Sequence, residues 1–164
     1  MTGFSFEIRN DDDILVRRLT GLHMRLGNLT TLMKWIAAYL RESTRERFKT
    51  NLGPDDVPWK PSLRVRLYGG RTLVDHGILR DSIVSDHGAD FAAVGTNDPR
   101  ALIHQLGGVI VPVRAKALAF NLPGVGFRMV KRVVMPARPF VGLSSADREK
   151  IDGLVDKYVR EAQA

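Results

Sequence analysis

Apolar and polar residues follow two different periods along the first fifty positions. Strict alternation over residues 4–9 predicts a half-buried strand. Leucines then recur at helical spacing over 15–26, after three aspartates at 11–13 that suit a helix N-terminus. Gly27 is a suitable stop for this helix. A second apolar stripe, extended by Phe48, predicts a long helix that starts near Asn28 and is ended by Leu52–Gly53–Pro54.

The next stretch, residues 51–72, has neither period. Three prolines, the pair Asp55–Asp56 and the pair Gly69–Gly70 predict a loop without regular structure. Trp59 is the exception, because a large ring is unusual in such a loop. We expect Trp59 to pin the loop to the core rather than to bind a ligand.

Short elements follow this loop. Residues 75–82 favour a short helical turn, and the segments 82–86 and 91–95 predict a hairpin. Asp98 is expected to cap a short helix that runs through Gln105 and ends at two glycines.

The last third of the chain predicts two strands and a helix. The strands are expected over 109–120 and 127–134, joined by a Gly/Pro loop, 121–126. Ser144 or Ser145 then caps an amphipathic helix. The whole pattern predicts a single α+β domain over residues 1–164. In it, a mixed or antiparallel sheet with a projecting hairpin is packed by the long helices of the N-terminal half and by the C-terminal helix.

Composition narrows the possible chemistry. The 164 residues include no cysteine, which excludes disulfides and cysteine-ligated zinc or iron–sulfur sites. The chain has no apolar run of the roughly 20 residues that a membrane span requires, and its first nine residues do not form a signal-peptide core. We therefore expect a soluble protein made in the cytoplasm, with no membrane partner.

Charge is distributed unevenly along the chain. The formal net charge is +7, and no Asp or Glu occurs from Pro99 through Ala146. The predicted hairpin over 109–134 could be a plain surface hairpin, a docking arm for a neighbouring subunit, or a lining that faces DNA phosphates. Only Phe120 and Phe127 could stack on bases there, so base-specific reading is not expected. The interface candidates are its basic residues: Arg114, Lys116, Arg128, Lys131 and Arg132.

Catalytic patterns are weak. The chain has no P-loop and no dinucleotide-binding glycine motif, and Ser144 fits a helix cap better than a nucleophile. The dipeptides Asp75–His76 and Asp86–His87 could serve a hydrolase only if folding joined them, and chance pairing in turns is the simpler interpretation. For His104 we favour a hydrogen bond to nearby backbone. We predict no enzyme, no cofactor and no metal site.

A basic stripe marks the second helix. Arg41, Arg45 and Lys49 recur at four-residue spacing, with Glu42 and Glu46 beside them. A solvated helix face is the favoured interpretation, and a subunit contact is the alternative.

Four motifs occur in order along the chain. A tryptophan follows the Pro/Asp-rich loop, a G-x-L-x-x-S turn lies at 77–82, IHQLGG occupies 103–108, and MPARPFVGLS occupies 135–144. In this order they resemble the phage virion morphogenesis family, small tail-completion proteins of tailed phages, over about residues 28–160. The motif residues are Trp59, Gly77, Leu79, Ser82, His104, Gln105, Gly107, Gly108, Pro136, Arg138, Pro139 and Phe140.

The resemblance implies a structural role in the virion, at the head-proximal end of the tail. Related neck and tail-completion proteins form rings, commonly six-fold, so the resemblance implies further copies together with other neck, connector and tail-tube proteins as partners. Non-specific contact with DNA is a secondary expectation, and a basic nucleic-acid-binding module using residues 109–134 is the alternative function. One departure is Arg100–Ala101–Leu102, where the family often has an aromatic–Ala pair, so we expect different packing around His104.

We call IHQLGG (103–108) the first signature and MPARPFVGLS (135–144) the second signature, and the second one also has a physical interpretation. Pro136 and Pro139 fix φ and lack amide donors, so this stretch should be extended and outside regular sheet pairing. We expect Arg138 to be a buried arginine that is hydrogen-bonded to backbone carbonyls or to a carboxylate. In a ring, the basic hairpin would meet an acid of the neighbour, from 11–13 or from 55–56.

Overall fold

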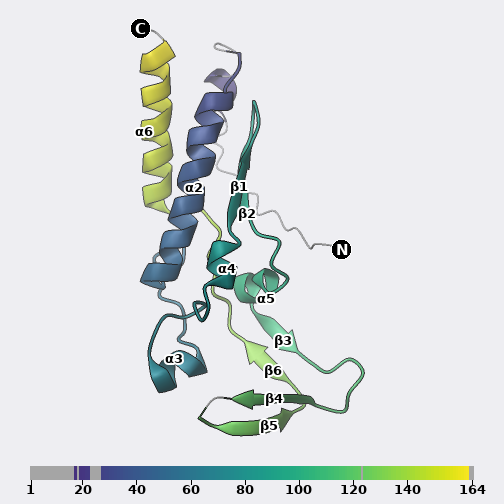
Figure 1. Cartoon of the computed structure of the whole chain (residues 1–164). Helices are drawn as coiled ribbons and strands as arrows, with labels where there is room; N and C mark the ends of the chain where they lie inside the picture. Colours follow the sequence, from purple (N-terminus) through teal and green to yellow (C-terminus); the bar gives the residue numbers. More distant parts are fainter. Residues whose placement is uncertain (1–16, 18, 23–26, 123, 163–164) are drawn as a thin grey trace.

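The computed structural model describes residues 17, 19–22, 27–122 and 124–162. Its upper half has three layers (Figure 1), in which α2 (Thr30–Thr50) lies between α6 (Ser145–Ala162) and a hairpin of β1 (Val84–His87) and β2 (Ala92–Gly95). The single long central helix therefore contacts both the C-terminal helix and the hairpin.

The N-terminal predictions are tested only in part. Residues 17 and 19–22 are helical, as predicted, and Leu19 and Leu22 pack against the upper core. The strand expected over 4–9 and the aspartates at 11–13 lie outside the described residues.

Helix α2 forms where its apolar stripe predicted it. The Asn28 side chain accepts a hydrogen bond from the Thr30 amide at 2.9 Å, and Asn51 ends the helix in the left-handed conformation at φ 60°. The stripe divides between two cores. Its first half packs on α6, and Phe48 enters a second core below.

Three short helices follow: α3 (Leu63–Tyr68), α4 (Ile78–Asp81) and α5 (Ala101–Leu106). The prediction of no regular structure over 51–72 is wrong for α3. The Ser62 side chain accepts a hydrogen bond from the Val65 amide and so caps this helix. Six residues are too few for a helical period to show in the sequence.

The cap expected from Asp98 is also wrong. Arg100 precedes α5 as its N-cap, and the Asp98 carboxylate instead accepts hydrogen bonds from the amide and guanidinium of Arg100. Gly107 ends α5 with φ +69°, as predicted. Ser144 caps α6, because its hydroxyl accepts a hydrogen bond from the Asp147 amide at 3.1 Å.

The described strands form three separate two-stranded antiparallel sheets. Besides β1–β2, these are β3 (Gly108–Ile110) with β6 (Val133–Met135), and β4 (Leu118–Leu122) with β5 (Gly126–Val130). The α+β class is confirmed, but the two continuous strands expected over 109–120 and 127–134 are wrong. Both are interrupted, at 111–117 and at 131–132, so the hairpin has two separate ladders.

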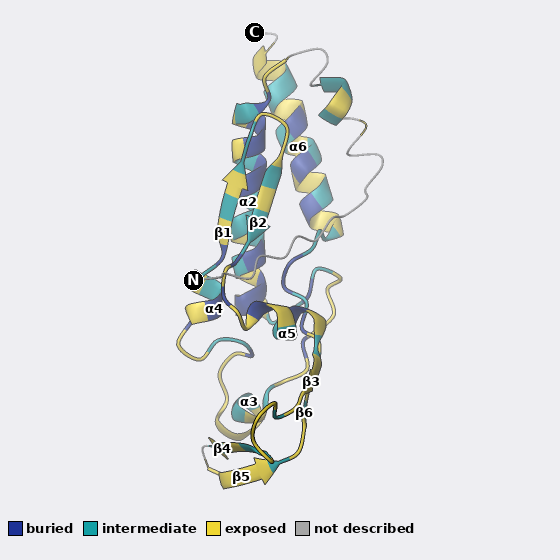
Figure 2. Ribbon diagram, turned by 90° about the vertical axis from the view of Figure 1, so that its right-hand side faces the viewer, coloured by how far each residue is buried: buried dark blue, intermediate teal, exposed yellow. Residues whose placement is uncertain are grey.

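Residues 108–135 form an arm that points away from the helices. Figure 1 shows β4–β5 at the end of the molecule opposite the C-terminus, and Figure 2 shows this end as largely exposed. One face of β4–β5 is open, because Ala119, Asn121, Phe127 and Met129 alternate onto it and all are exposed. The arm is therefore attached to the body but little covered by it.

Candidate functional site

Residues from three of the four motifs meet in one hydrophobic core below α2, and Gln105 of the IHQLGG motif bonds to the backbone of that core. We call this group the motif core. It joins segments that lie up to 93 residues apart in the sequence. Its buried members are Phe48, Trp59, Leu79, Ile83, Ala101, Phe140 and Val141.

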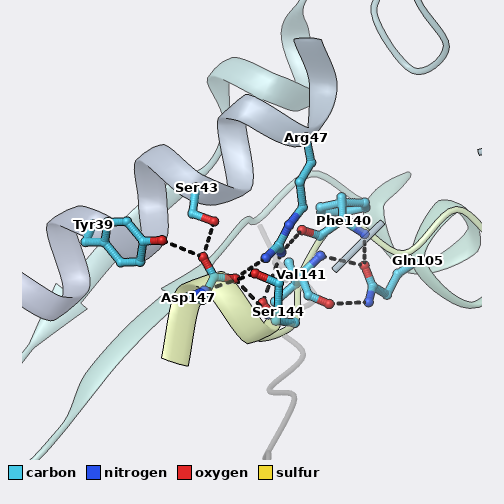
Figure 3. Close-up of polar contacts among 9 residues, drawn as sticks. Tyr39, Ser43, Arg47, Gln105, Phe140, Val141, Ser144 and Asp147 are labelled. Carbon is cyan, nitrogen blue, oxygen red and sulfur yellow. Dashed lines mark hydrogen bonds and ion pairs between the residues drawn. The ribbon is translucent and has the colours of Figure 1, made fainter. Parts of the chain in front are cut away.

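The Gln105 side chain binds the backbone of the second signature directly (Figure 3). Its Nε2 donates to the Val141 carbonyl at 2.8 Å, and its Oε1 accepts from the amides of Phe140 and Val141 at 2.9 and 3.1 Å. The side chain is buried, so these bonds replace the water that the backbone groups have lost. Gln105 therefore acts on the chain at 140–141 as a neighbouring strand would.

Close approach explains the glycine that follows. A Cβ added to Gly107 would lie 2.6 Å from the Ala137 amide nitrogen, and its φ of +69° is one that other residues rarely adopt. A Cβ at Gly108 would lie 3.0 Å from Ile103. The two signatures thus touch through main chain as well as through Gln105.

The other two motifs contribute Trp59 and Leu79 to the same core. Trp59 Nε1 donates to the Pro139 carbonyl at 2.8 Å, and the Trp59 ring packs edge-on against Phe48. This confirms that Trp59 pins its loop to the core. In the G-x-L-x-x-S turn, Gly77 precedes α4 at φ +76° and the Ser82 hydroxyl donates to the Leu79 carbonyl at 2.7 Å.

Arg138 is buried, with 4% of its surface exposed. Its Nε donates to the Lys60 carbonyl at 2.8 Å, and its backbone amide donates to the His104 carbonyl at 2.7 Å. The predicted bond to a backbone carbonyl is therefore confirmed. Pro136 and Pro139 lie outside every described strand, as expected.

His104 differs from the prediction. Its Nδ1 is buried and has no hydrogen-bond partner in the part of the chain that the structure describes, so the expected bond to nearby backbone is wrong. Burial lowers the pKa of His104, and the charges of Arg138 and Arg100 lower it further. This imidazole is therefore neutral at pH 7.

A buried ion pair links the motif core to both long helices. Arg47 Nη1 donates to the carbonyls of Phe140 and Gly142 at 2.8 and 3.0 Å, and Nη2 pairs with Asp147 Oδ2 at 2.5 Å (Figure 3). The Asp147 carboxylate also accepts hydrogen bonds from three further groups: the hydroxyls of Tyr39 and Ser43 and the amide of Ser144.

These contacts shift the pKa values of Asp147 and Tyr39. Burial alone would raise the pKa of Asp147, but hydrogen bonds from Ser43, Ser144 and Tyr39 outweigh it and the pKa falls below its usual value. Burial and the neighbouring carboxylate raise the pKa of Tyr39 to about 12. Sequence reasoning missed this network. The one feature of the sequence that could have indicated this network is the Ser144-x-x-Asp147 spacing. It is typical of a capping box, in which each side chain accepts a hydrogen bond from the backbone amide of the other residue.

The basic stripe on α2 is only partly solvated. Lys49 pairs with Glu46, and Arg41 pairs with Glu42, both near the surface. Arg45 instead reaches the turn after α4, where its Nη2 donates to the Ile83 carbonyl at 3.2 Å. The prediction of a solvated face is therefore wrong for Arg45.

The five interface candidates all lie exposed on the arm. None of them forms an ion pair within the described residues, and Arg128 bonds only the adjacent Phe127 carbonyl. Large apolar side chains are exposed beside them: Val109, Val111, Val113, Phe127, Met129 and Val134.

The two Asp–His dipeptides are not joined. Asp75 pairs with Arg64 and with His76, whereas Asp86 accepts a hydrogen bond from the His87 amide. Nowhere in the described ranges do three or more His, Asp or Glu side chains form a group that could hold a metal ion. No helix among these residues combines the length and apolar character needed to cross a membrane.

Comparisons with known proteins identify the family that the four motifs resemble. The model of the phage virion morphogenesis family matches residues 10–160. The chain belongs to this family. The "Mu-like prophage FluMu G protein 2" of Haemophilus influenzae is 32% identical over 145 residues, 88% of each chain. "Putative capsid assembly protein G" of Escherichia phage Mu is 32% identical over 159 residues, 90% of this chain and 92% of its own. No solved structure matches the chain.

Membership confirms the expected resemblance and fixes the broad role. This is a phage virion morphogenesis protein of structural type. Within this family member, every motif residue named from the sequence lies in or beside the motif core or the arm that leaves it. The motif residues therefore contribute to the packing and hydrogen bonding that hold these segments together.

Replacing Arg47 with methionine should strongly destabilise this family member. The change leaves the buried Asp147 carboxylate without its counter-charge and frees two carbonyls, for an expected loss of about 3–5 kcal/mol in the free energy of unfolding. Urea unfolding followed by the fluorescence of the two tryptophans, Trp35 and Trp59, measures the loss. Arg41→Met, on the same helix but near the surface, should cost less than about 1 kcal/mol. Equal losses for the two variants would contradict the role given to Arg47.

His104 should make stability fall in mild acid. Its folded-state pKa lies below the usual 6.5, so below about pH 6.5 the unfolded chain binds a proton that the folded chain does not. The free energy of unfolding should then decrease by up to about 1.4 kcal/mol per pH unit. Urea unfolding at pH 7.5 and 5.5 should show a smaller decrease for His104→Gln. An unchanged decrease would contradict this.

Proposed function

We propose that this family member acts in tail completion and head–tail joining, as a non-enzymatic subunit of a ring at the head-proximal end of the tail. Copies would join head to tail, with a hexamer favoured. Other neck, connector and tail-tube proteins are the proposed partners, in a virion assembled in the host cytoplasm. The name of the phage Mu relative refers to capsid assembly, which is consistent with a place where capsid and tail meet.

The arm carries this proposal. It exposes apolar side chains beside unpaired basic ones, and such mixed patches are typical of surfaces that another protein covers. Its base is fixed by β3–β6, which continues directly from α5 and ends at the second signature. A rigid base with an uncovered end suits a docking element.

A ring also needs a second, different patch on each subunit. Asp55 and Asp56 are exposed in the loop after α2, next to the exposed Val57. This acidic and apolar surface complements the arm in charge and in character. The aspartates at 11–13 are the other acidic candidate, and they lie outside the described residues.

Reversing charge on the arm should prevent assembly without unfolding the subunit. Arg128→Glu, Lys131→Glu and Arg132→Glu together place three like charges against an acidic neighbour. Purified particles should contain less than a tenth of the wild-type amount of this chain by quantitative mass spectrometry. The control changes the net charge by the same amount on the exposed faces of α2 and α6, through Lys34→Glu, Lys150→Glu and Arg160→Glu together. Normal incorporation of the arm variant would contradict the proposal.

The second candidate is a nucleic-acid-binding module that uses the same arm, favoured by its five unpaired cations. Duplex binding should then weaken steeply with salt, with a slope of log K against log[salt] near –0.9 for each phosphate contacted. Replacing Arg114, Lys116, Arg128, Lys131 and Arg132 by alanine should abolish it. An electrophoretic mobility assay at about 50 mM salt that detects no complex would exclude this candidate.

A further inference from the structure

A cavity of about 550 Å³ lies beside the motif core. It is bounded by the segment from Lys60 to α3, by the turn before α4, and by β6 with the proline that follows it. Most of its wall is apolar, from side chains that include Pro61, Leu63, Val74, Ile78, Met135 and Pro136. Several cations also line it, so the cavity combines an apolar wall with positive charge.

Arg138 is the most unusual of these cations. It is buried, yet only its Nε has a hydrogen-bond partner among the described residues, the Lys60 carbonyl. Its two terminal nitrogens have none, and the residue lines the cavity. Burial lowers the pKa of Arg138, and no nearby carboxylate offsets this. A buried guanidinium without a counter-charge is costly to keep in a folded chain.

The neighbouring charges do not supply the missing partner. Arg64 pairs with Asp75, the carboxylate that lines the cavity, at 3.6 Å, and Arg100 pairs with Asp98. His104 is neutral, and its pKa is lowered partly by Arg138 itself. After these pairs are counted, the cavity keeps an excess of positive charge from Lys60 and Arg138.

We propose that this cavity is a carboxylate-binding site, which receives an acidic residue flanked by apolar side chains from a neighbouring protein chain in the particle. The carboxylate would bind the two free terminal nitrogens of Arg138, whose planar fork matches two carboxylate oxygens. The flanking apolar side chains would cover the cavity wall. The identity of the donor as a virion chain rests on the proposed function, whereas carboxylate binding itself does not.

A peptide carboxylate fits better than a phosphate of DNA. Duplex binding relies on many exposed cations along a surface, whereas here one free fork, from a residue with 4% of its surface exposed, lines a cavity whose wall is mostly apolar. The apolar side chains of that wall would gain nothing from a hydrated phosphate backbone. Binding of inorganic phosphate is therefore the competing outcome that the test must separate.

The test uses the full chain and two small probes. Ac-Leu-Glu-Leu-amide should shift the NMR signals of the Arg138 guanidinium and the His104 ring in a saturable way. The neutral isostere Ac-Leu-Gln-Leu-amide should bind at least tenfold more weakly, because it lacks the charge. Equal binding of the two peptides, or no binding of either at 20 mM (about the upper end of useful concentrations), would overturn the proposal. So would inorganic phosphate that displaces the Glu peptide at equal concentration.

Arg138→Met separates a binding role from a purely structural one. It removes a charge that has no counter-charge and also the Nε bond to the Lys60 carbonyl, two opposing effects, so thermal stability of the isolated chain should change little while Glu-peptide binding is lost. Arg66→Met, at an exposed position of α3, should retain binding. A less stable Arg138→Met chain that still binds the peptide would refute the site. Because this measurement needs no ring, its failure leaves the arm-reversal experiment as an independent test of the proposed function.

Discussion

The structure depends on how the backbone of residues 136–142 is satisfied. Two prolines keep this segment out of sheet pairing, yet it crosses the centre of the molecule, where unpaired amides and carbonyls are costly. Side chains take the place of a neighbouring strand: Gln105 bonds residues 140 and 141, Trp59 bonds 139, and Arg47 bonds 140 and 142. Each comes from a different element, so satisfying one segment fixes the relative positions of α2, α5 and the loop after α2.

The same constraint connects the two ends of the molecule. Arg47 also pairs with Asp147, which lies in the first turn of α6. The hydroxyls of Tyr39 and Ser43, both on α2, donate hydrogen bonds to the same carboxylate. On the other side, α5 runs directly into β3, and β6 runs directly into the prolines. The arm therefore leaves the body from both strands of its base at the point where the chain is most firmly bonded.

The unsatisfied features gather in the lower half of the molecule. Counting only partners among the described residues, the arm has an uncovered sheet face and five unpaired cations, and the cavity beside its base holds an arginine with two unbonded nitrogens. The upper half, with α2, α6 and β1–β2, buries its apolar stripe in the usual way.

Local periodicity and turn residues in the sequence predicted the long helices, the β1–β2 hairpin and the α4 turn, because each depends on neighbouring residues. The burial of Trp59 was predicted from the presence of a large ring in a loop, and that of Arg138 from the two prolines beside it. The motifs predicted the family. Only the tertiary structure decided what those motifs do. The partners of Gln105 lie 35 and 36 residues away, and Arg47 and Asp147 lie 100 residues apart, so no local pattern could pair them. The interruptions of the arm strands at 111–117 and 131–132, and the two unbonded terminal nitrogens of Arg138, also depend on how distant segments pack. Local sequence propensity does not predict such packing.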